Sequence, residues 1–221
     1  VRYSGTCNTT LCASTPVTVS CVNWLGTVSS DWNNSANWQG NIIPDATKDV
    51  TIPSAPSNQP HVTLAPGSPA VCNNITVESG ATLTINAGKA LTVSGNLANA
   101  GTVDIKATAG GIGSLITNGT VSGAGSLKME QYLTGSGGAT PDGLFYYVSS
   151  PIPNATAANY IGGGKLWVAD EANQSYPEFT FGGIPLDVGR GYVARMGANG
   201  AVTFDGSSFN TGIQSASGLT R

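Results

Sequence analysis

The sequence predicts an all-β fold in which a short, β-helix-like solenoid region precedes a β-sandwich or jelly-roll-like region. Helix signals are nearly absent, because no window of eleven or more residues combines helical apolar spacing with a cap. Short apolar runs instead alternate with turns rich in Gly, Pro and Asn, which is typical of strands. Finally, i, i+2 apolar pairs recur within residues 39–131, a span without Phe, Tyr or Trp. Such a span needs a narrow core filled by aliphatic side chains.

Composition excludes several classes of protein. The chain has 221 residues, 40% hydrophobic and 10% charged, with a net charge of −3. A disordered acidic tail would be less hydrophobic and more charged. A nucleic-acid partner is not expected, since the nine Lys and Arg residues form no basic cluster. No apolar run reaches the roughly 18 residues needed for a membrane-spanning helix.

Residues 1–21 form a Cys-rich N-terminal extension. Three of the four cysteines, Cys7, Cys12 and Cys21, lie here, and Cys72 lies further on. An even total of four cysteines, three of them in a Thr- and Ser-rich stretch, indicates disulfides and an oxidising compartment. We favour the pairs Cys7–Cys12 and Cys21–Cys72 among the three possible pairings. A metal site is the alternative, but zinc sites use tighter Cys and His spacings.

Residues 22–133 are predicted to form a Trp-capped β-solenoid. Apolar i, i+2 pairs would point into the coil, and the alternative is an ordinary β-sandwich of short hairpins. Three asparagines recur every 22 residues, each ahead of a strand-like run. Trp24, Trp32 and Trp38 either cap the open end of the stack or stack on a ligand as exposed rings. The pairs are Ile75/Val77, Leu83/Ile85, Leu91/Val93, Val103/Ile105 and Leu127/Met129, and the asparagines are Asn74, Asn96 and Asn118.

Residues 134–221 are predicted to form the sandwich-like region, truncated at its C-terminal end. It holds Trp167, all five Phe and five of the seven Tyr residues, and Trp167 is a fourth candidate for ligand stacking. We expect a linker or large loop at 135–143 and one or two helical turns at 154–161. Both chain ends are expected to be cuts within a longer chain. The expected strands are 144–152, 165–170, 176–181, 191–196 and 201–206.

Candidate catalytic residues are few. His61, the only histidine, follows Pro60 and is predicted to face solvent at a strand start. Four carboxylates could converge as in glycosidases, but their spacing does not require it, and solvated strand ends are favoured. We therefore predict no enzyme activity and no cofactor, with calcium at three aspartates as a minor alternative. The four carboxylates are Asp170, Glu171, Glu178 and Asp187, and the three aspartates are Asp31, Asp45 and Asp49.

Several motifs in fixed order resemble a known protein family. They are W-x-G-x-x-S-x-D-W-N-x-x-x-N-W at 24–38, IPDATKDVTIPS at 43–54, AVCNNITVESGATLTI from residue 70, SLITNGTVSGAGSLKMEQYLTG at 114–135 and YYVSSPI at 146–152. This order is similar to a repeat module of large surface proteins exported by the type IX secretion system of Gram-negative bacteria. The resemblance implies an exported, adhesin-like protein and supplies no catalytic residue. Residues 1–21 lie outside it.

The sequence therefore predicts a non-catalytic structural or adhesive module of a bacterial extracellular surface protein. It could also be a subunit of a surface fibre, with residues 1–21 added as a strand to the open edge of a neighbour. The alternative is a carbohydrate-binding module attached to a secreted enzyme, which requires exposed tryptophans. Expected partners are further copies of the chain, other surface proteins or glycans, and the type IX secretion apparatus during export.

Overall fold

A computed structural model describes residues 21–135, 144–170 and 172–210. The fold is all-β, with a β-solenoid-like arrangement of about five turns, as predicted. The chain divides into two compact units. Among the described residues, the first unit comprises 21–104 and 113–125, and the second comprises 105–112, 126–135, 144–170 and 172–210.

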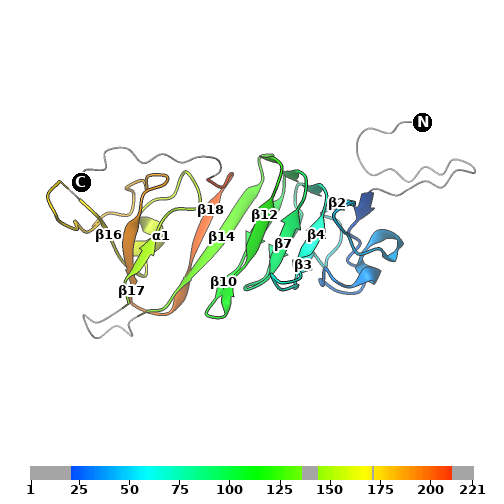
Figure 1. Ribbon diagram of the computed structural model, residues 1–221, viewed down its shortest axis with the longest axis horizontal. Helices are drawn as coiled ribbons and strands as arrows, with labels where there is room; N and C mark the ends of the chain where they lie inside the picture. Colours follow the sequence, from blue (N-terminus) through cyan, green and yellow to red (C-terminus); the bar gives the residue numbers. More distant parts are fainter. Residues whose placement is uncertain (1–20, 136–143, 171, 211–221) are drawn as a thin grey trace, which may run out of the picture. The chain divides into compact units, whose positions relative to one another are not determined.

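The first unit is a coil of three parallel sheets that the chain visits in rotation (Figure 1). Within each sheet, strands from successive turns lie side by side and pair in parallel, as β2, β5 and β8 do. One sheet contains β1 (Cys21–Asn23), β2 (Asp49–Ile52), β5 (Ile75–Val77), β8 (Leu97–Asn99) and β13 (Val121–Ser122). Another sheet contains β3 (His61–Val62), β6 (Thr82–Ile85) and β9 (Thr102–Ile105). The remaining sheet contains β4 (Ala70–Cys72), β7 (Ala90–Val93) and β12 (Ser114–Thr117).

The core of this coil is aliphatic, because alternate residues of each short strand point inward. The predicted pairs Ile75/Val77, Leu83/Ile85 and Leu91/Val93 are buried here, as is Val103. The remaining members of the predicted pairs belong to the second unit, in which Ile105 and Leu127 are buried and Met129 is half-buried. The narrow interior explains the absence of aromatic residues from 39–131, since three close sheets leave no space for aromatic rings.

Side chains at one corner of the coil form a ladder of hydrogen bonds between turns. Asp49 Oδ1 accepts from the backbone N–H and the side-chain amide of Asn74 at 3.1 and 2.8 Å. Asn74 Oδ1 in turn accepts from the Asn96 N–H at 2.8 Å. Asn96 Oδ1 accepts from the N–H and the hydroxyl of Thr120 at 2.9 and 3.0 Å. Each turn therefore satisfies a backbone donor of the next.

The predicted asparagine period holds for two members and is wrong for the third. Ile75 pairs with Leu97, 22 residues on, but Leu97 pairs with Val121, 24 residues on. Because this turn has two more residues, Thr120 takes the position at which Asn118 was expected.

The predicted Cys21–Cys72 disulfide is wrong, because Cys72 is a free cysteine. Cys72 occupies an inward position of β4 and is fully buried, whereas Cys21 is half-buried beside the inward Val22 of β1. The two side chains thus occupy positions of opposite orientation in their strands. Cys7 and Cys12, and with them the second predicted pair, lie outside the described residues.

The second unit combines antiparallel sheets with one helical turn. β14 (Ser126–Leu133) pairs with β18 (Gly200–Gly206), and β10 (Ala107–Thr108) forms a hairpin with β11 (Gly111–Ile112). A third sheet has the order β15 (Tyr146–Val148), β17 (Tyr192–Met196), β16 (Gly164–Val168). The helical turn is α1 (Ala158–Ile161), within the predicted 154–161. The predicted sandwich is not confirmed by these sheets.

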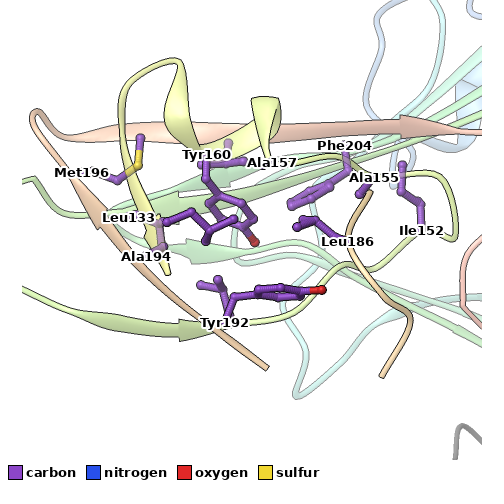
Figure 2. Close-up of a cluster of buried hydrophobic side chains, with 13 residues drawn as sticks. Leu133, Ile152, Ala155, Ala157, Tyr160, Leu186, Tyr192, Ala194, Met196 and Phe204 are labelled. Atoms are coloured by element: carbon purple, nitrogen blue, oxygen red, sulfur yellow. The ribbon is translucent and has the colours of Figure 1, made fainter. Parts of the chain in front are cut away.

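Four of the five strands expected here exist, and the fifth is not a strand. Residues 176–181 contribute only an isolated bridge, between Glu178 and Trp167 of β16. The core of this unit is aromatic as well as aliphatic. Figure 2 shows Tyr160 beside Phe204 in this cluster, with ring centroids 5.6 Å apart. Burial raises the pKa of Tyr160, whose hydroxyl donates to Gln131 Oε1 at 2.9 Å.

Candidate ligand-binding face

The three N-terminal tryptophans are buried in a cap over the first full turn of the coil. Trp24, Trp32 and Trp38 are at most 1% exposed, and Trp38 meets both other rings edge-on, with centroids 4.9 and 4.6 Å away. Backbone hydrogen bonds from Trp24 to Thr51 and from Trp32 to His61 attach the cap to β2 and β3. Buried rings cannot stack on a ligand. The alternative prediction, that these three tryptophans stack on a ligand, is therefore wrong.

Asn37 organises the loop that carries these rings. Its Oδ1 accepts from the N–H groups of Val28 and Ser29 at 3.0 and 2.9 Å. Its amide donates to Ser29 Oγ and to the Asp31 carbonyl at 3.0 and 2.9 Å. Two 3₁₀ turns, η1 (Ser35–Asn37) and η2 (Gln39–Asn41), complete the cap. The three tryptophans and Asn37 of the motif at 24–38 therefore have structural roles in the cap.

Trp167, the fourth candidate, lies on a surface instead of in a core. In the sheet of β15, β17 and β16, Tyr147 of β15 is opposite Val193 of β17. Val193 is in turn opposite Trp167 of β16. Directly opposite residues project from the same side of a sheet. Tyr147 is 88% exposed, and Trp167 is half-buried. A row with an aromatic side chain at each end therefore crosses the sheet.

Phe145 extends this row into a patch, which we call the aromatic face: Phe145, Tyr147 and Trp167. Phe145 is 55% exposed, and its ring centroid is 5.8 Å from that of Trp167, with a tilt of 58°. The opposite side of the same sheet packs into the core through Leu166, Tyr192 and Ala194. The aromatic rings are therefore held on a sheet whose inner side is fixed by packing.

Charged side chains border the aromatic face. Lys165 Nζ lies 3.1 Å from Glu178 Oε2, and Glu178 is the bridge partner of Trp167. Arg195 is opposite Lys165 in the register of β16 and β17. The face thus combines apolar ring surfaces with hydrogen-bond donors and acceptors, the combination that fixes small ligands in orientation. Sequence reasoning named Trp167 but missed Phe145 and Tyr147, because only the register reveals which strands are neighbours.

The other candidate groups are not brought together. His61 begins β3 and is half-buried, with its N–H bonded to the Ser30 carbonyl. Asp170 bonds to Asn173, and Asp187 pairs with Arg190, while Glu171 lies outside the described residues.

The three aspartates considered for calcium serve separate local structures. Asp31 accepts from Thr63, Asp45 from Thr47, and Asp49 belongs to the ladder. Within the described ranges, no group of three or more His, Cys, Asp or Glu side chains could hold a metal ion. The same ranges contain no helix long and apolar enough to cross a membrane.

These features define a β-solenoid protein with an aromatic face on a further sheet. The chain belongs to a family described as a domain of unknown function (DUF8693), whose model matches residues 23–216. No curated protein and no solved structure matches the chain.

Proposed function

We propose that the chain is a non-catalytic adhesive module of a bacterial extracellular surface protein, exported by the type IX secretion system. The aromatic face is the observation that carries the binding role. Exposed aromatic rings that lie together on a rigid sheet are costly to leave in water and are enriched at interfaces. The resemblance of the motifs at 24–152 to modules of exported surface proteins supports the location.

The solenoid supports a structural role in the same module. Its turns are joined by the ladder from Asp49 to Thr120, and its first turn is covered by the tryptophan cap. Each turn stabilises its neighbours in such a stack, so the coil provides a stable platform.

The location is tested by antibody labelling of intact cells of the producing bacterium. Labelling without permeabilisation is the expected result, and labelling only after lysis would overturn the surface location.

The binding role is tested in the same cells with the double variant Tyr147→Ala, Trp167→Ala. We expect the variant to reach the surface but to lower the attachment of cells to the growth surfaces that wild-type cells colonise. Unchanged attachment at equal surface display would overturn the binding role.

A further inference from the structure

We infer that the aromatic face binds the sugar rings of a polysaccharide. This inference rests on the proposed function, because it names the class of ligand for the same face. The row from Tyr147 through Val193 to Trp167 carries the inference. Two strand spacings separate its ends, which is about 10 Å between their backbones. One extended chain of sugar units could therefore contact both aromatic residues.

The chemistry of the face fits a ligand that is apolar on its ring faces and polar at its rim. Sugar rings present C–H groups on their faces and hydroxyl groups around their edges. The rings of Tyr147 and Trp167 supply flat apolar surfaces. The Lys165 ammonium donates hydrogen bonds and the Glu178 carboxylate accepts them, and both lie at the border of the face.

The size of the face argues against a second copy of the chain as its occupant. The longest strands of this sheet have five residues, and the sheet has three strands. The face therefore measures about 17 Å by about 15 Å, or roughly 250 Å². A stable protein–protein interface buries about 800 Å² on each partner. The face is too small for that, but it suits a few sugar units.

Charge argues against single-stranded nucleic acid, the other common ligand of exposed aromatic rings. Nucleic-acid stacking platforms lie in a positively charged groove that follows the backbone phosphates. Here Lys165 is paired with Glu178, and the whole chain has a net charge of −3.

Affinity gel electrophoresis of the full chain tests the inference, with laminarin, xylan, galactomannan, hydroxyethyl cellulose and alginate as the immobilised polymers. We expect retardation of the wild-type chain by at least one polymer. Tyr147→Ala and Trp167→Ala should each weaken that binding roughly tenfold. Phe181→Ala is the matched control, because Phe181 is 69% exposed but lies outside the three strands, and it should bind like wild type.

Tyr147→Ala keeps the experiment decisive if Trp167→Ala impairs folding, because the Tyr147 side chain is 88% exposed. The inference is overturned if none of the five polymers retards the wild type, or if Tyr147→Ala binds as tightly as wild type. Different results would overturn the sugar-binding inference and the proposed adhesive function. Loss of cell attachment in the double variant without any retardation in the gels would keep the adhesive role and exclude these sugars as its ligands. Retardation by a polymer without surface labelling would keep the sugar ligand and overturn the adhesive role.

Discussion

At the scale of single residues, the cap depends on polar contacts made by a fully buried side chain. Asn37 is 0% exposed, and its amide group makes four hydrogen bonds within the loop. A buried donor that loses its acceptor costs about 1–3 kcal/mol, since water cannot replace the partner. Asn37 therefore contributes more to stability than a surface asparagine of the same loop.

We predict that Asn37→Ala lowers the free energy of unfolding by about 3 kcal/mol, because it leaves the Val28 and Ser29 N–H groups without their acceptor. Asn33→Ala is the matched control, since Asn33 is exposed in the same loop, and it should change stability by less than about 0.5 kcal/mol. Urea unfolding followed by tryptophan fluorescence measures both. Equal effects of the two substitutions would contradict a special role for Asn37.

A second prediction at this scale concerns the thiol of Cys72. Burial in the coil, with a smaller effect of the Asp49 charge, raises the pKa of Cys72 to about 12. The thiolate is the reactive form, so the native thiol should resist alkylation. We expect iodoacetamide at pH 8 to leave Cys72 unmodified in the native chain and to modify it in guanidinium chloride, as measured by peptide mass mapping. Rapid modification of the native chain would show that the coil opens at β4.

At the scale of elements, the corner ladder requires close approach of the backbone. Gly119 lies against the Asn96 side chain and the Gly95 carbonyl, and a Cβ atom there would overlap both. Gly95 lies in the same way against the Asn74 side chain, one turn earlier. The glycines thus allow each ladder side chain to reach the next turn.

Gly119→Ala should therefore destabilise the chain by about 2 kcal/mol, since neither Asn96 nor the backbone can move without breaking ladder hydrogen bonds. Gly67→Ala is the control, because a Cβ at Gly67 would meet no atom within 4 Å, and its effect should stay within about 0.5 kcal/mol. Thermal unfolding followed by circular dichroism measures both. A Gly119→Ala chain as stable as wild type would show that the corner can rearrange.

The hairpin of β10 and β11 gives a prediction about pH. Burial alone would raise the pKa of Glu130, but the Ala107 N–H and the Lys106 ammonium outweigh burial and lower the pKa below its ordinary value of 4.5. A carboxyl group with a lowered pKa stabilises the fold above its unfolded pKa, and this contribution is lost as pH falls through the folded pKa.

We therefore expect wild type to lose stability below about pH 4.5 partly through Glu130. Glu130→Gln should be less stable than wild type at pH 7, and the difference should shrink as pH falls to 3. Urea unfolding at pH 7, 5, 4 and 3 measures it. A difference that stays constant with pH would exclude a role for the Glu130 charge.

Two properties of the coil, strand alternation and the number of residues in each turn, explain which elements could be predicted from the sequence. Apart from the half-buried Met129, the i, i+2 pairs predict the buried positions correctly, because alternation is a local property of a strand. The failure at Asn118 has a different origin, since the length of each turn depends on pairing with the previous one. Residues 176–181 have strand-like composition but make only a bridge to β16. The aromatic face likewise depends on register between distant strands, which one sequence does not encode locally.

At the scale of the whole molecule, the two units are interleaved along the sequence. Residues 105–112 belong to the second unit, although residues of the first unit precede and follow them. These residues contain the whole β10–β11 hairpin, and Glu130 of β14 bonds to Lys106 and to the Ala107 N–H at its start. The first unit has its own cap, ladder and aliphatic core. We therefore expect it to fold cooperatively without β14 or β18.

A fragment of residues 21–125 tests this organisation by hydrogen–deuterium exchange. We expect amides bonded in the cap and in the parallel strands to stay protected, because each turn of a solenoid is stabilised mainly by its neighbours. Amides of residues 105–112 should lose the protection they have in the full chain, since the fragment lacks Glu130 and the strands against which the hairpin packs. Protection lost throughout the fragment would show that the solenoid depends on the second unit. Protection retained in the hairpin would show instead that the hairpin belongs with the coil.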